Sequence, residues 1–155
     1  MSSRNPARPD RKPMIALVHY ADRAFQAHMV ENAHAKGRPE IKPSHNAVFG
    51  HLGDEPRRAA DLAAAAAMTL QSMGELVREL VGLGILEMVP DPTDGRAKLV
   101  TFSAGGKKFA NAGFRHLRAV EKRLETEFGE DYEAARRVLE RIAEVLADVP
   151  GGAEA

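Results

Sequence analysis

Apolar side chains recur every three or four residues in several long segments of this chain, which is the spacing of one face of an α-helix. In the segment 14–35 the residues with this spacing are Met14, Val18, Ala21, Phe25 and Met29. The same spacing runs over 114–128 and, after a break near Gly129, over 135–146. The pattern therefore predicts one long helix near the N-terminus and two near the C-terminus.

Shorter elements are predicted for the middle of the chain. Pro43 suits the first turn of a short helix that ends at Gly53, and the alanine-rich run 57–66 favours another helix. Thr69 is a suitable N-cap for a fourth helix that ends at 82–84. This fourth helix would bury Met73, Leu76, Val77 and Leu80. The two helices between 61 and 84, joined by a turn, indicate a helix-turn-helix.

Two β-prone runs, 85–89 and 98–102, flank the pair Asp94-Gly95. Because an Asp-Gly pair supplies the positive φ angles of a tight hairpin turn, we predict a β-hairpin that turns at this pair. Arg96 would then lie at its exposed tip. Helix, turn, helix and basic-tipped hairpin in this order make a winged helix, which is an arrangement that reads duplex DNA.

The predicted fold class is mainly α with a small β-hairpin wing, a winged helix-turn-helix flanked by N- and C-terminal dimerisation helices. The expected parts are a mobile basic arm at 1–12, an N-terminal dimerisation helix at 13–40, the winged helix-turn-helix at 41–102, C-terminal dimerisation helices at 103–149, and a disordered tail at 150–155. A compact winged helix offers no partner to the apolar stripes of the flanking helices, and leaving them in water forgoes about 25 cal/mol per Å². We therefore expect an obligate two-fold homodimer.

Composition excludes several classes of function. The 155 residues can form one domain with its own core. They contain no cysteine, which excludes disulfides, thiolate zinc sites and thiol redox switches. No apolar run reaches the roughly 18 residues of a membrane span, and the first residues do not resemble a signal peptide. We expect a cytoplasmic protein without a membrane segment.

The predicted DNA-binding segment, residues 57–98, which we call the reading head, carries no excess of positive charge. The whole chain carries 22 cationic and 22 anionic side chains. Within 57–98, five cations face six anions, a net charge of minus one. A broad basic DNA-binding patch is therefore not expected. Affinity for DNA would depend on a few well-placed cations, on backbone amides at helix starts and on the presence of two subunits.

The segment 61–103 resembles the MarR family of winged helix-turn-helix transcription regulators, and the likeness extends from about 14 to 149. The matching stretches are Asp61-Leu62-Ala63, the polar positions Thr69, Gln71 and Ser72, the exit Leu83-Gly84-Ile85-Leu86-Glu87, and the wing Asp91-Pro92-Thr93-Asp94-Gly95-Arg96-Ala97-Lys98. The wing is the most specific of these matches. Three residues depart from the pattern: Ala67 replaces a turn glycine, Glu75 replaces a basic or neutral residue, and Lys42 replaces a better N-cap before Pro43.

The resemblance implies a recognition helix in the major groove and a wing in the flanking minor groove. The residues expected to serve DNA binding are Arg57, Arg58, Thr69, Leu70, Gln71, Ser72, Glu75, Arg78, Asp94, Arg96 and Lys98. Arg96 would enter the minor groove, held by the carboxylate of Asp94. Gln71 could read adenine. Arg57 and Arg58 stand at a helix start, where a cation is disfavoured, so an external anion is a reasonable partner for them.

The contacts of the other expected DNA-binding residues follow from their chemistry. Leu70 suits a thymine methyl group, and Glu75 could accept from a cytosine amino group or remain solvated. Thr69 and Ser72 can donate to phosphate or to a base edge. Arg78 and Lys98 are phosphate candidates, weighed evenly against solvated charges.

The resemblance also implies a small aromatic or anionic effector, bound between the dimerisation helices and the reading head. His19, Arg23 and His51 are the candidate ligand-binding residues, although histidines with purely structural roles are the commoner case. No two of the six histidines are spaced three or four apart, so no helical metal site is indicated, and no cofactor is expected.

Three functions remain to be distinguished. The leading one is a homodimeric transcription regulator that represses a pseudo-palindromic operator in double-stranded DNA and is released by an effector. The alternative is a winged-helix interaction module without DNA binding, which the net charge of minus one over 57–98 favours. An enzyme is the weakest reading, because Gly-x-Ser-x-Gly and phosphate-loop motifs are absent from the sequence.

Overall fold

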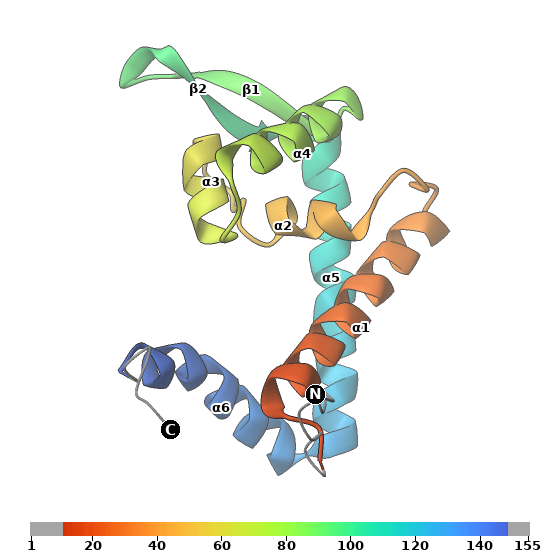
Figure 1. The fold of residues 1–155 in the computed structure, drawn as a ribbon. Coiled ribbons are helices and arrows are strands. Elements are labelled where there is room, and N and C mark those ends of the chain that lie inside the picture. The colour runs from red at the N-terminus through yellow and green to blue at the C-terminus, as the bar shows by residue number, and fades with distance from the viewer. Residues whose placement is uncertain (1–10, 149–155) are drawn as a thin grey trace, which may run out of the picture. The chain divides into compact units, whose positions relative to one another are not determined.

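The computed structural model describes residues 11–148. Its elements are α1 (Met14–Ala35), η1 (Pro43–His45), α2 (Asn46–Phe49), α3 (Ala59–Ala65), α4 (Leu70–Gly82), β1 (Leu86–Asp91), β2 (Asp94–Phe102), α5 (Ala104–Phe128) and α6 (Glu130–Ala147), shown in Figure 1. The predicted class, mainly α with a β-hairpin wing, is confirmed. Most of the expected arm at 1–12 and all of the expected tail at 150–155 lie outside the described residues.

The chain forms two compact units, 1–113 and 114–155. The first unit holds a hydrophobic core built from α1, α2, α3, α4 and the base of the hairpin. Its fully buried side chains include Leu52, Leu62, Met73, Leu80 and Ile85. The core covers one face of α3 and one face of α4, so the opposite faces of both helices remain exposed.

Helix α4 begins and ends as its sequence predicts. Thr69 is the N-cap, and its Oγ1 accepts a hydrogen bond from the backbone N–H of Ser72 at 3.1 Å. Beyond Gly82, Gly84 adopts a φ of 70°, which glycine enters without steric cost and which turns the chain into β1. The first turn of the helix, which carries the expected base-reading residues, is thereby fixed at its start.

The turn between α3 and α4 depends on Ala67, which departs from the glycine of the family pattern. Its φ is 51°, so it adopts the left-handed geometry that glycine enters more easily. For a residue with a Cβ this geometry costs roughly 1–2 kcal/mol. The turn therefore keeps its shape at the expense of local strain.

The wing turns at a different place from the one predicted. The strands pair in antiparallel register from Leu86↔Phe102 to Pro90↔Lys98, and Asp91 then pairs with Asp94. The turn is therefore Pro92-Thr93, and Gly95 does not adopt a positive φ. The side chain of Asp91 accepts hydrogen bonds from the Thr93 N–H at 2.8 Å and from its hydroxyl at 2.7 Å, which closes the turn. The prediction of a turn at Asp94-Gly95 is wrong.

The residues that follow this turn form an irregularity in β2. Between Pro90↔Lys98 and Asp91↔Asp94 the register shifts, so that residues 95–97 have no opposite partner in β1. Such a bulge bends a strand and redirects its side chains. Arg96 lies in this bulge and is exposed.

The base of the wing is joined to the elements on both sides of it. Arg57 and Val100 exchange two backbone hydrogen bonds, of 3.0 and 2.7 Å, which adds a one-residue bridge to β2. On the other side, Gly106 of α5 is buried against Ile85, and a Cβ at this glycine would lie 1.8 Å from the Ile85 carbonyl oxygen. Only glycine fits this contact between α5 and the start of the wing.

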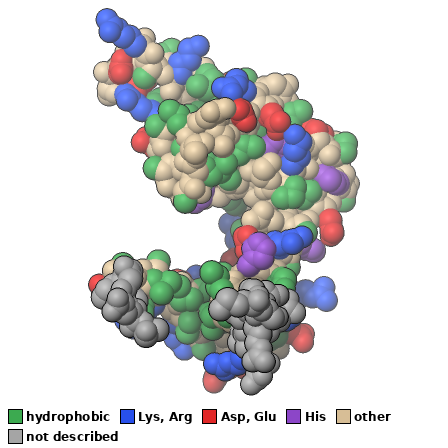
Figure 2. Space-filling view, in the orientation of Figure 1, with side chains coloured by type: hydrophobic (Ala, Val, Ile, Leu, Met, Phe, Trp, Pro, Cys, Tyr) green, Lys and Arg blue, Asp and Glu red, His purple; other side chains and the backbone are tan. Residues whose placement is uncertain are grey.

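The second unit has a different character. Helix α6 carries an apolar stripe but no buried residue, and the part of α5 in this unit has none either. Leu139 and Leu146 are 53% and 63% exposed. Hydrophobic side chains are visible along α6 in Figure 2. None of the helices among residues 11–148 is long and apolar enough to cross a membrane.

Candidate nucleic-acid interface

One face of α4 is free and polar. The exposed residues are Leu70, Gln71, Glu75, Arg78 and Glu79. They lie opposite Met73, Val77 and Leu80, which are buried as predicted. The face is therefore presented by a helix whose other side is fixed in the core.

The first turn of α4 orders its polar side chains before any partner binds. The hydroxyl of Thr69 donates to that of Ser72 at 2.9 Å while accepting from the Ser72 N–H. The Ser72 hydroxyl therefore keeps its own proton for a further acceptor. The amide nitrogen of Gln71 lies 3.4 Å from a carboxylate oxygen of Glu75, which leaves the amide oxygen of Gln71 available.

Arg78 lies across the helix that carries it. A Cβ placed on Gly74 would stand 3.3 Å from Nη1 of Arg78, so the guanidinium folds back over this glycine. The positive charge is thereby held near the middle of the exposed face rather than beyond its end. A larger residue at position 74 would displace it.

The wing carries two exposed cations, Arg96 and Lys98. Lys and Arg side chains stand out on the wing at the upper left of Figure 2. The expected pairing of Asp94 with the Arg96 guanidinium is replaced by a different contact, since Oδ1 of Asp94 accepts from the backbone N–H of Arg96 at 3.1 Å. Asp94 thus fixes the backbone of the bulge and leaves the guanidinium free to turn.

An ion pair joins Arg58, the N-cap residue of α3, to the wing. The Nε and Nη2 atoms of Arg58 lie 2.9 and 2.6 Å from Oδ2 of Asp91, whose side chain is 5% exposed. Hydrogen bonds from Thr93, and then the guanidinium of Arg58, lower the pKa of Asp91 to about 2. Nη2 of Arg58 also lies 3.7 Å from Oδ2 of Asp94. The sequence reading gave Arg58 an external anion, but its partner is Asp91.

Arg57 also has an internal partner. Its Nη1 donates to the carbonyl oxygen of His51 at 2.9 Å. Together with its backbone bridge to Val100, this bond ties the end of α2 to the wing. Both arginines thus have internal partners, and the expectation of an external anion at them stays a prediction.

The three residues expected to bind an effector all lie among the described residues, and no side-chain hydrogen bond or ring contact joins them to one another. His19 and Arg23 are exposed on α1, and His51 is half-buried beyond α2. The described residues provide no hydrogen bond or ring contact that links His51 to either of the other two. Nor do residues 11–148 contain a group of three or more His, Asp or Glu side chains that could hold a metal ion.

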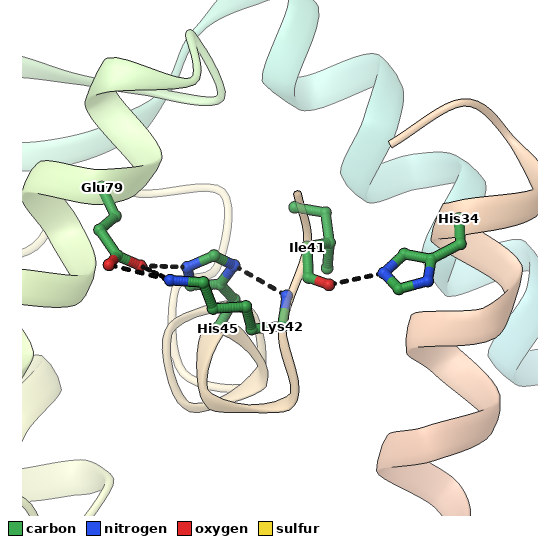
Figure 3. A network of polar contacts seen from close by, with 5 residues as sticks. All are labelled: His34, Ile41, Lys42, His45 and Glu79. Atoms are coloured by element: carbon green, nitrogen blue, oxygen red, sulfur yellow. Dashed lines mark hydrogen bonds and ion pairs between the residues drawn. The ribbon is translucent and has the colours of Figure 1, made fainter. Parts of the chain in front are cut away.

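His45 is a polar residue that the sequence reading did not single out. It is fully buried, and its ring joins the backbone of Lys42 to the carboxylate of Glu79 on α4 (Figure 3). At the start of η1, Nδ1 of His45 also accepts from the backbone N–H of the N-cap residue Lys42, which is the return bond of a capping box. A histidine in a polar stretch gives no periodic signal, and its partner lies 34 residues away.

Solved structures share this architecture over most of the chain. A MarR family transcriptional regulator from Silicibacter pomeroyi superposes with a TM-score of 0.68, covering 86% of this chain and 94% of that one at 20% identity. The chain has the fold of the MarR-family transcriptional regulators. Wild-type MarR from E. coli gives 0.67 at 15% identity, covering 86% of this chain and 98% of its own.

A probable transcriptional regulator from Pseudomonas aeruginosa superposes with a TM-score of 0.64 at 24% identity. It covers 83% of this chain and 96% of its own. No model of a known protein family matches the sequence, and no curated protein is significantly similar to it. The resemblance seen in the residues is therefore confirmed at the level of the fold.

Proposed function

We propose that this protein is a dimeric, sequence-specific DNA-binding transcription regulator that represses a pseudo-palindromic operator. The observation that supports this best is the free polar face of α4 beside a wing with an exposed Arg96, both fixed on one core. Structural neighbours described as transcriptional regulators, and one described as a repressor, have the same fold. In the proposed complex, α4 lies in the major groove as the recognition helix and the wing lies in the flanking minor groove.

Base reading is assigned to the first turns of α4. Gln71 offers an amide oxygen to the amino group of adenine, and Leu70 suits a thymine methyl group. Ser72 and Thr69 donate to phosphate or to a base edge. Glu75 orients Gln71 and can accept from a cytosine amino group.

Attraction to the phosphate backbone is assigned to few cations. Arg78 and Lys98 face phosphates, and Arg96 enters the minor groove, where the negative potential is strongest in narrow tracts. Arg57 and Arg58 act indirectly, because they join the wing to the helix-turn-helix. With a net charge of minus one over 57–98, each exposed cation carries a large share of the attraction.

The second subunit is proposed from the apolar faces that the first does not cover. These are α6, with Leu139 and Leu146, and the first half of α1, with Ile15. Burial against a second copy removes them from water and places two copies of α4 on one duplex. A small aromatic or anionic effector, bound near His19, Arg23 and His51, would release the dimer from DNA.

Selection from random-sequence duplexes tests the function directly. The wild-type protein should enrich a pseudo-palindromic site, and anisotropy titrations at several salt concentrations then measure its affinity. Arg96→Ala should weaken binding about tenfold and reduce the slope of log K against log salt by about one. Lys36→Ala removes one exposed charge at the end of α1 and should leave both quantities unchanged.

The alternative function is a winged-helix interaction module without DNA binding. The acidic balance of 57–98 is the observation that favours it. Failure of the wild-type dimer to enrich any duplex would support this alternative and reject the proposed regulator. Enrichment with an unchanged Arg96→Ala variant would keep the regulator and remove Arg96 from its mechanism.

A further inference from the structure

The segment between α1 and α2 makes three polar attachments to the C-terminal half of α4, one of which is the exposed ion pair between Lys42 and Glu79. Nη2 of Arg38 donates to the carbonyl oxygen of Leu83 at 3.2 Å, at the end of the helix. One turn earlier, Nε2 of His45 lies 2.9 Å from Oε2 of Glu79. The helix is therefore held from outside at its end, in addition to its contacts with the core.

The geometry gives each nitrogen of the buried His45 ring one role. The backbone N–H of Lys42 can only donate, so Nδ1, 3.2 Å away, is the acceptor. Nε2 then carries the proton in the neutral ring and donates it to Glu79 (Figure 3). With a side chain that is 1% exposed, His45 has no room to turn and exchange these partners for water.

The same segment is also attached to α1. Nε2 of His34 lies 2.8 Å from the carbonyl oxygen of Ile41, the residue that precedes Lys42. The sticks of Figure 3 show the polar chain running from His34 through Ile41, Lys42 and His45 to Glu79. A continuous set of hydrogen bonds thus connects α1 with α4.

The position of Glu79 on α4 determines which other side chains move with it when the helix rotates. Glu79 lies four residues after Glu75 and eight after Gln71, so the three side chains follow one stripe of the helix. A rotation of α4 that moves Glu79 therefore moves Gln71 in the same direction. The first turn is held by the Thr69 cap and by the buried Met73, so the bond at Glu79 adds a polar constraint toward the other end of the helix.

We propose that His45 is a positioning residue for the recognition helix: its bond to Glu79 sets the rotation of α4 and hence which side chains face the bases. This inference rests on the proposed function as a DNA-binding regulator. Phosphate contacts tolerate a rotated helix better than base contacts do, because they lack a fixed donor and acceptor pattern. Loss of the bond therefore lowers specific binding more than non-specific binding.

Two substitutions of His45 separate its two hydrogen bonds. His45→Gln keeps a donor near the position of Nε2, and His45→Asn keeps an acceptor near that of Nδ1. The measured quantity is the ratio of affinities for the selected duplex and for a scrambled duplex of equal length, at a temperature where every variant is folded. His45→Asn should lower this ratio about tenfold, as expected for a lost hydrogen bond to a charged group, and His45→Gln should keep it within about threefold.

Substitutions of its neighbours provide the controls. Glu79 is 46% exposed, so Glu79→Leu should fold and should lower the ratio as much as His45→Asn does. The two changes combined should lower it no further, since they remove the same bond. Lys42→Met removes the exposed ion pair to Glu79 but keeps the backbone N–H, and it should leave the ratio unchanged.

The outcomes distinguish this inference from the function on which it rests. If the wild-type protein selects no duplex, the proposed function fails and the inference fails with it. If it selects one, and Glu79→Leu keeps the full ratio, His45 does not position α4 although the protein is a regulator. Equal losses from His45→Gln and His45→Asn, or a lowered melting temperature without a changed ratio, would assign His45 a packing role only.

Discussion

The two units of this chain contain helices with similar apolar stripes, but only the stripe in the first unit is buried. In the first unit, α4 buries Met73, Val77 and Leu80 completely or nearly so. In the second, α6 has an equally clear apolar stripe, yet no residue of it is buried. The difference teaches that periodicity tells which face of a helix must be covered, whereas the covering elements depend on the rest of the chain.

The two helices differ in how much burial of apolar side chains stabilises them. Burial of one leucine-sized side chain contributes roughly 1.5–3 kcal/mol, and α6 leaves several such side chains in water. The first unit has its own core. The second has none among its described residues, so its apolar side chains stay exposed in a single copy of the chain. Substitutions should therefore affect the two units in separable ways.

The largest effect is expected from charges on the stripe of α6. Leu139→Lys combined with Leu146→Lys should convert the dimer to a monomer and weaken binding to the selected duplex at least about a hundredfold, because a monomer holds only one half-site. Sedimentation and anisotropy measure the two effects. Arg141→Ala, at a side chain 74% exposed, is the matched control and should remain dimeric. A double variant that sediments like the wild type would contradict the proposed role of α6.

A smaller effect, confined to the first unit, is expected from Asp91→Asn. It weakens the bonds to Arg58 and Thr93, and it should lower the melting temperature by about 5 °C at neutral pH. The pKa of Asp91 is about 2 in the folded chain, below its usual 3.8, so its contribution is complete above pH 4 and is lost as the pH falls through 2. The difference between variant and wild type should therefore disappear near pH 2.

Asp94→Asn is the control for this pH dependence. Asp94 lies farther from Arg58, at 3.7 Å, and its side chain is half-exposed. Its melting curves should follow those of the wild type at each pH. If both variants lost stability equally, the contribution would come from the general charge of the wing and not from the Asp91 contact.

The smallest effect is expected from Ala67→Gly. Relief of the left-handed geometry is partly offset by the greater freedom of glycine in the unfolded chain, which leaves a net stabilisation of about 0.5–1 kcal/mol. Ala64 lies within α3 and has no left-handed geometry to relieve. Ala64→Gly should therefore destabilise the protein by about 1 kcal/mol. Urea unfolding of both variants measures the difference. Equal destabilisation would show that the turn is not strained at Ala67.

Local signals predicted most of the elements. The spacing of apolar residues gave α1 its observed bounds, Met14–Ala35, and gave α4 its buried face. The wing turn was misplaced because two turn signals compete within eight residues. Asp94-Gly95 is a strong signal alone, but Asp91 forms the turn with Thr93 and is held by Arg58, which lies 33 residues away.

Local signals also predicted part of the candidate interface but not all of it. The exposed residues of α4 follow from its buried ones, since they are the other side of one helix. The internal partners of Arg57 and Arg58, His51 and Asp91, could not be predicted because tertiary contacts bring them together. His45 was missed for the same reason, because its burial against Glu79 depends on tertiary contacts.

The bulge and the bridge of the wing also protect the ribbon from self-association. A two-stranded ribbon offers free backbone groups along its edges, on which another copy could add a strand. Here Arg57 occupies the edge of β2 at Val100, residues 95–97 disrupt it near the turn, and Pro90 removes one donor from β1. These features leave little of either edge free to add a strand from another copy of the chain.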